Sequence, residues 1–271
     1  MSTSTGNMDV LPDQGNRDLT VDENGYYQPK DMWMEICGIY DLYQFCINLL
    51  GEVNGKRLLD CGCGSGNTAI MFAKRGANVS GFDTDEGELE IARTLAKSNE
   101  VEVDFRSTSF ETTGHEDESF DIAFGAFIIH HVDIERAMQE ANRVLKPGGR
   151  AVFIENSARN SLLMFARRNI VGSYGVPKYG DDEEEHPLTL EDLDTARRHF
   201  PGQMTVHHTD FLFFRLIDLY IFQKRFRLMT GLLRGLDSLS MTLWPGIKRY
   251  SYFQVLQFDK PLVQPVEAGA Q

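Results

Sequence analysis

Three glycines alternate with other residues in the segment LLDCGCGSGNTAI (58–70), between an apolar run and a stretch with helical periodicity. Because Gly62, Gly64 and Gly66 lack a Cβ atom, the chain can turn tightly and bring its backbone amides against a ligand at the start of a helix. Two carboxylates flank this turn. Asp60 comes just before it, and Asp83 ends the next apolar stretch, VSGFD. A carboxylate at the end of a second strand can accept the hydroxyls of a ribose, so the pattern predicts a nucleoside site.

The spacing of the glycines separates two nucleoside cofactors. NAD sites usually carry G-x-G-x-x-G with a pyrophosphate at the helix end, whereas this chain has G-x-G-x-G. The carboxylate of Asp60 beside the turn would repel a pyrophosphate but attract a ligand with an ammonium and a sulfonium. The pattern therefore favours S-adenosylmethionine, although a tight strand-to-helix turn can also use glycines for structural reasons alone.

Strand-like and helix-like segments alternate around these residues. Apolar stretches predict strands at 57–62, 79–83, 101–107, 120–129 and 150–155, and helical periodicity separates them at 67–77, 86–97 and 134–146. Strands joined by helices of this length imply right-handed crossovers. We therefore expect an α/β fold with a doubly wound, mostly parallel, seven-stranded Rossmann-like sheet.

The remaining segments predict additions to this sheet. We expect one helix at 31–50, or two broken near Gly38, and further helices at 160–171 and 189–200, the last capped by Thr189 with Asp192 three residues on. Strands are expected at 204–214 and 250–258. The resulting units are a flexible tail (1–24), an N-terminal helical cap (25–56), the cofactor-binding core (57–157), a lid region (158–203), the last two strands with a helical insertion at 215–249 (204–262), and a second tail (263–271).

Composition excludes several classes of function. A formal net charge of −13 disfavours a nucleic-acid partner, because binding to phosphate backbones depends on Lys and Arg. The four cysteines show no metal-ligand spacing, so we expect reduced thiols and no metal site. No stretch reads as a signal peptide or approaches the roughly 18 apolar residues of a membrane span, so we expect a cytoplasmic protein, with peripheral membrane attachment left open.

Four motifs in order carry a resemblance to a known family: LLDCGCGSG, GFD, ESFDIAFGAFIIHHV and EANRVLKPGGRAVFIE. Over about residues 35 to 155 the chain resembles the class I S-adenosylmethionine-dependent methyltransferases, specifically the small-molecule group similar to the ubiquinone and menaquinone methyltransferases. The resemblance implies that the glycine turn wraps the methionine and sugar, that Asp60 faces the methionine amine and that Asp83 holds the ribose. The full set of cofactor-binding residues implied is Asp60, Gly62, Cys63, Gly64, Gly66, Asp83, Thr84, Ser109, Phe110, Gly125 and Ala126.

One implied contact departs from the family pattern. Relatives usually place an Asp, followed by a small or apolar residue, where this chain has Ser109 and Phe110. A Ser hydroxyl can still accept a hydrogen bond from the adenine amino group. Main chain near Gly125 and Ala126 would line the sulfonium.

Candidate bases follow the fourth and fifth predicted strands. Methyl transfer is an in-line displacement, so a base is needed only when the acceptor starts protonated. The candidates are His130, His131 and Glu155, and the alternative for the two histidines is a packing or capping role.

The insertion at 215–249 is apolar and basic in an otherwise acidic chain, with Arg215, Lys224, Arg225, Arg227, Arg234, Lys248 and Arg249. It predicts either contact with an anionic membrane or, through 211–249, packing on the sheet or on a second subunit. With Trp33, Tyr40 and Tyr43 nearby, we expect an apolar, aromatic acceptor pocket.

The expected function is methyl transfer to a small, lipophilic acceptor, with a hydroxyl oxygen as the preferred atom to be methylated. The alternatives are C-methylation of a quinone or isoprenoid-type substrate and a non-catalytic S-adenosylmethionine-binding regulatory or scaffold protein.

Overall fold

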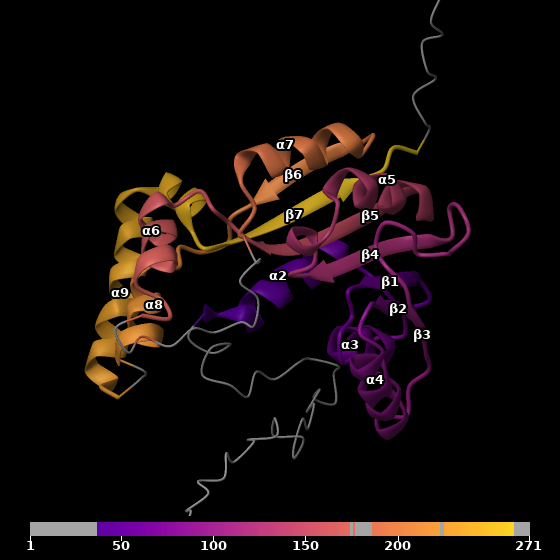
Figure 1. Ribbon diagram of the computed structural model, residues 1–271, viewed down its shortest axis with the longest axis horizontal. Helices are drawn as coiled ribbons and strands as arrows, with labels where there is room; N and C mark the ends of the chain where they lie inside the picture. The colour runs from indigo at the N-terminus through magenta and orange to yellow at the C-terminus, as the bar shows by residue number, and fades with distance from the viewer. Residues whose placement is uncertain (1–36, 174–175, 177–185, 223–224, 263–271) are drawn as a thin grey trace, which may run out of the picture.

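The computed structural model describes residues 37–173, 176, 186–222 and 225–262 (Figure 1). Both predicted tails, the start of the predicted helix at 31–50, Trp33 and Lys224 lie outside the described residues. No helix within the described ranges is long and apolar enough to cross a membrane.

A seven-stranded sheet organises the chain, in the order β3-β2-β1-β4-β5-β7-β6, and it confirms the predicted Rossmann-like fold. Among the strands described, β7 alone runs antiparallel to its neighbours β5 and β6. The strands are β1 (Arg57–Cys61), β2 (Asn78–Asp83), β3 (Val103–Ser107), β4 (Phe120–Ala126), β5 (Leu145–Asn156), β6 (Gln203–His207) and β7 (Phe253–Asp259). Since β1 and β4 are neighbours and the chain leaves β1 towards β2, the order reverses there, which is where open α/β sheets bind ligands.

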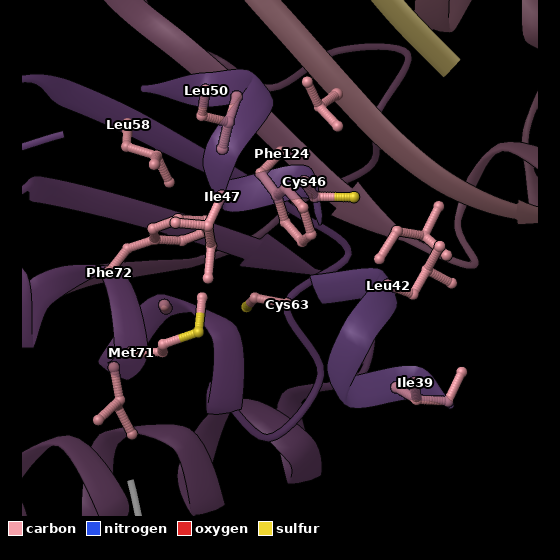
Figure 2. Packing of buried hydrophobic residues seen from close by; sticks show 14 of the residues in the cluster. Ile39, Leu42, Cys46, Ile47, Leu50, Leu58, Cys63, Met71, Phe72 and Phe124 are labelled. Atoms are coloured by element: carbon pink, nitrogen blue, oxygen red, sulfur yellow. The ribbon is translucent and has the colours of Figure 1, made fainter. Parts of the chain in front are cut away.

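Helices cover both faces of the sheet, as Figure 1 shows. On one face lie α2 (Ile39–Leu50), α3 (Asn67–Lys74) and α4 (Glu86–Ser98); on the other lie α5 (Ile134–Val144) and α7 (Leu190–His199). Figure 2 shows side chains of α2 and α3 meeting Leu58 and Phe124 on the first face. The predicted cap of α7 is present, because the Thr189 and Asp192 side chains bond each other's backbone amides.

Several predicted boundaries were wrong for local reasons. The helix at 134–146 ends at Val144, because the residue before Pro147 is disfavoured in a helix, and β5 starts at Leu145 instead of at 150. The strand predicted at 120–129 ends at Ala126, and a 3₁₀ turn, η1 (Ile129–His131), follows.

The strand predicted at 204–214 also stops early, at His207. Beyond it, the Leu212 amide donates to Ser251 Oγ at 3.0 Å instead of to a neighbouring strand. The chain therefore leaves the sheet before it enters the insertion.

The insertion and α6 (Ser161–Asn169) form a helical group at the edge towards which β4 and β5 point (Figure 1). It contains α8 (Phe214–Ile217), the π-helix η2 (Asp218–Phe222), α9 (Arg227–Leu243) and the 3₁₀ helix η3 (Pro245–Tyr250). Buried Asp237 of α9 holds α8, accepting from the Phe214 amide at 2.9 Å and from Arg215 Nε at 2.8 Å. Arg215 also pairs with Asp210 and is buried, so this basic residue of the insertion packs on the protein and is not part of an exposed surface.

Candidate active site

The glycine turn joins β1 to α3 and is fastened to the end of β2. Gly62, Gly64 and Gly66 all have positive φ, at 67°, 47° and 81°. The Cys63 amide donates to the Phe82 carbonyl at 2.9 Å, and the Gly64 amide donates to Asp83 Oδ2 at 2.8 Å. The turn and the second carboxylate predicted from the sequence are therefore brought together.

The three glycines serve two different purposes. A Cβ on Gly62 would come within 2.6 Å of Ile128, and one on Gly66 within 2.8 Å of Ala92, so both positions need glycine for packing. A Cβ on Gly64 would meet no atom within 4 Å. Gly64 is therefore the glycine of the turn that faces open space, where a ligand can approach the backbone.

Asp60 is a buried carboxylate placed beside this turn. It is 2% exposed, and among the described residues its Oδ2 atom has no hydrogen-bond partner. Its pKa is raised to about 7, mainly by burial and in smaller part by the nearby charge of Asp83, while a hydrogen bond from the Ala69 amide acts in the opposite direction. A buried, unpartnered carboxylate fits the ammonium group of a methionine moiety.

Asp83 lies at the end of β2 and is partly exposed. Its Oδ1 accepts from the Asp85 amide at 3.0 Å, and each carboxylate oxygen has two lone pairs, so both can still accept a ribose hydroxyl. Thr84 is exposed next to it.

The residues expected at the adenine differ in what they can offer. Ser109 Oγ lies 3.4 Å from Thr112 Oγ1 and is partly exposed. Phe110 is 1% exposed and packs against Phe82 and Phe153 in the core. Because the Phe110 side chain is buried in the core, we expect any contact of Phe110 with the cofactor to come from its main chain.

The end of β4 packs closely against β1 and the turn that follows β4. Gly125 pairs with Cys61, and a Cβ on Gly125 would lie 3.0 Å from the Cys61 carbonyl oxygen and 2.8 Å from Ile128. After Ala126, Phe127 adopts φ 60°, a left-handed conformation that costs a residue with a side chain about 1 kcal/mol or more. Backbone strain of this kind is concentrated at functional sites.

The cysteines of the turn act as small packing residues. Cys61 and Cys63 are both buried and free of disulfides. Burial raises the pKa of both thiols, so neither is a thiolate at neutral pH.

The three candidate bases lie next to one another but are not equivalent. Glu155 is fully buried; its Oε1 accepts from the Ile128 and Ile129 amides at 2.9 and 2.6 Å, and its Oε2 lies 2.6 Å from His130 Nδ1. The His131 ring is exposed and lies 4.1 Å from the His130 ring. Glu155 and His130 therefore have the geometry of residues that hold the turn after β4.

An apolar cavity of about 250 Å³ opens between α6, α8 and η2. Tyr252 lines it. The Tyr252 and Phe253 rings contact each other in a tilted arrangement with centroids 5.4 Å apart, and the Phe253 and Phe127 centroids are 5.8 Å apart, so a row of rings connects the cavity to the end of β4. Tyr40 and Tyr43, expected at the acceptor pocket, do not line this cavity; Tyr43 packs against Phe124.

Sequence reasoning missed Tyr252 and Asp218. Asp218 starts the π-helix beside the cavity, is 1% exposed, and among the described residues neither of its carboxylate oxygens has a partner. Its signal was available, because it is the single acidic residue in the apolar run FFRLIDLYIF.

If Asp60 pairs with the ammonium group of the cofactor, its pKa predicts that cofactor affinity depends on pH. Only the deprotonated carboxylate pairs with an ammonium, so we expect the affinity for S-adenosylmethionine to rise as pH increases through about 7. It should fall again when the ligand's own α-amino group loses its proton, near pH 8. Calorimetric titrations between pH 5.5 and 9 check this. In Asp60→Asn the rise should be absent, and an unchanged profile would contradict the assignment.

Comparisons with known proteins bear on the family and the fold. Residues 59–153 match the family model described as a methyltransferase domain. A ubiquinone biosynthesis O-methyltransferase from Rhizobium leguminosarum bv. trifolii (strain WSM2304) is 34% identical over 157 residues, which cover 54% of this chain and 62% of the relative. The structure of geranyl diphosphate methyltransferase in complex with GPP and sinefungin matches with a TM-score of 0.54 and 19% identity, over 82% of this chain and 78% of that one. The [4+2]-cyclase SpnF matches with a TM-score of 0.55 and 18% identity, over 87% and 85% of the two chains.

The sheet order and the glycine turn define a Rossmann-like nucleoside-binding fold. The matched region belongs to the class I S-adenosylmethionine-dependent methyltransferases and is a distant homologue of the ubiquinone biosynthesis O-methyltransferases. S-adenosylmethionine is the methyl donor that this family implies. The match spans less than two thirds of the relative's length, and the solved structures show the fold alone, since it is shared with a protein named as a cyclase.

Proposed function

We propose that the protein transfers the methyl group of S-adenosylmethionine to a hydroxyl oxygen of a small, lipophilic acceptor. The observation that carries the acceptor class is the apolar cavity, which the rings of Tyr252 and Phe253 connect to Phe127 after β4. Leu163, Leu216 and Ile217 are among its lining residues, and Arg167 is the one cation among those described there. A hydrocarbon tail fits such a lining, whereas a diphosphate group would need more positive charge.

Each part of the site has a task in this proposal. When bound, the cofactor supplies an activated methyl group. Asp60 holds the ammonium, Asp83 the ribose hydroxyls, and the main chain of Gly125 and Ala126 lies beside the sulfonium. Glu155 fixes the turn after β4 through the Ile128 amide, so that strained backbone is held in one position. The His131 ring is exposed at that turn. We assign His131 the role of the general base that accepts the proton of the acceptor hydroxyl.

The cavity predicts a dependence on tail length. With catechols that carry alkyl tails of increasing length, we expect KM to fall by up to about fourfold for each CH₂ buried. Release of S-adenosylhomocysteine measures the rate. Ala166→Phe fills the cavity and should raise the KM of long-tailed catechols by about tenfold while leaving the tail-free compound unchanged.

Ser161→Phe is the matched control, because it adds the same ring to the exposed start of α6, outside the cavity lining. If KM does not change with tail length, or if Ala166→Phe and Ser161→Phe change KM equally, the assignment of the acceptor cavity is overturned. Saturable cofactor binding with no turnover of any catechol would favour the non-catalytic alternative.

C-methylation of a quinone or isoprenoid-type acceptor remains the second candidate. It is favoured by the shared fold with an enzyme named for geranyl diphosphate, together with the apolar cavity. Proton NMR of the product distinguishes the two, since O-methylation leaves every ring hydrogen in place and C-methylation removes one.

A further inference from the structure

Exposed apolar side chains gather on the helical group formed by α6, η2, α9 and η3. Twelve large hydrophobic residues are exposed in the described parts of the chain, and ten of them lie here. They are Leu162, Phe165, Ile170, Ile221, Phe226, Leu228, Leu232, Leu239, Leu243 and Trp244. A concentration of this kind marks an interaction surface.

On α9 the apolar stripe faces away from the protein. Leu228, Leu232, Leu239 and Leu243 are 92%, 57%, 51% and 76% exposed. Their spacing of four, seven and four residues places them along one side of the helix. Leu233 and Asp237 are buried on the opposite side, where Asp237 pairs with Arg215. The helix therefore presents leucines outward and an ion pair inward, the reverse of an ordinary surface helix.

The exposed charges of the helical group are positive. Between residues 161 and 172 and between 218 and 250, the two acidic residues are Asp218 and Asp237, and both are buried. The basic residues described in these two segments are Arg167, Arg168, Arg225, Arg227, Arg234, Lys248 and Arg249. In a chain with a net charge of −13, this group therefore presents positive charge beside exposed leucines.

We propose that this surface docks on an anionic phospholipid membrane, with α9 lying in the interface. Leucines and the rings of Phe226 and Trp244, at the two ends of α9, would enter the boundary of the acyl chains, while the arginines reach the phosphates. A second copy of the chain fits less well, because a symmetric contact would bring the same arginines against each other.

The docked surface includes the rim of the apolar cavity. Leu162, Ile170 and Ile221 are exposed and also line the cavity. A tailed acceptor could then pass from the bilayer into the cavity without crossing water. This last step rests on the proposed function, whereas the docking itself does not.

Co-sedimentation with vesicles tests the docking. The full chain is mixed with vesicles of phosphatidylcholine alone or with roughly 30 mol% phosphatidylglycerol, at low and high salt. We expect pelleting with the anionic vesicles that weakens as salt increases. Leu228→Asp combined with Leu243→Asp should reduce binding at least about tenfold, and so should Arg227→Gln combined with Arg234→Gln.

Leu262→Asp is the matched control, because Leu262 is 80% exposed and lies outside the helical group. It should bind like the unmodified chain. Calorimetry should give all variants the same affinity for S-adenosylmethionine, which separates failure of docking from failure of the cofactor site. No pelleting with anionic vesicles, or equal pelleting of the Leu228/Leu243 variant, would overturn the proposal. So would a dimer in gel filtration that the Leu228/Leu243 variant dissociates.

Discussion

Replacement of Asp83 by alanine should weaken the binding of S-adenosylmethionine by about 100-fold, because two hydrogen bonds from ribose hydroxyls to a carboxylate are each worth about 1.5 kcal/mol or more. Asp83 also accepts the Gly64 and Asp85 amides, so its removal can loosen the turn as well. Calorimetry measures the affinity. Asp104→Ala is the charge control, because it removes an exposed carboxylate from the neighbouring β3.

A ligand change separates the two effects of this substitution. The 2′,3′-dideoxy analogue of S-adenosylhomocysteine lacks both ribose hydroxyls. The unmodified chain should distinguish the analogue from S-adenosylhomocysteine, and Asp83→Ala should bind the two compounds equally, as in a double-mutant cycle. If Asp83→Ala still discriminates between them by the full factor, the hydroxyls do not meet Asp83.

Gly64→Ala should weaken cofactor binding by at least about tenfold, a loss of 1.4 kcal/mol. Its Cβ would enter the open space beside the turn, where the proposed ligand passes close to the backbone. Because the φ of Gly64 is 47°, the substitution should also lower the free energy of unfolding by about 1 kcal/mol. Calorimetry and urea unfolding measure the two effects.

Gly55→Ala is a matched control for the backbone strain. Gly55 has φ 73°, a Cβ there would meet nothing within 4 Å, and it lies before β1, at the opposite end of that strand from the turn. It should show a similar loss of stability and unchanged cofactor affinity. Equal loss of affinity in both variants would mean that Gly64 serves the turn alone.

Much of the sheet could be predicted from the sequence because the alternation of strands and helices is visible in short, local stretches of residues. Segments such as VSGFD and RAVFIE are short apolar runs between helices of regular length, and such runs form parallel strands buried on both faces. The boundaries that failed depend on partners distant in sequence. The strand predicted at 204–214 ends at His207, and beyond it the Leu212 amide bonds to Ser251, a residue 39 positions away.

The residues expected on the cofactor side of the site could also be predicted from the sequence, whereas those on the acceptor side could not. Asp60, Gly64 and Asp83 lie close to one another in the chain, at the ends of two predicted strands, so their meeting follows from the sheet. The burial of Arg215 against Asp237 and the connection from Tyr252 to Phe127 depend on how the insertion folds back on the sheet. Helical spacing alone predicts that such helices exist but not which side faces the protein.

A crystal structure of the chain with S-adenosylhomocysteine tests the cofactor site most directly. The ligand's amino group should lie within hydrogen-bond distance of Asp60 Oδ2, and its ribose hydroxyls within the same distance of the Asp83 carboxylate, with the backbone of Gly64 in contact with the ligand. A ligand bound elsewhere, or a ribose turned away from Asp83, would contradict the assignment.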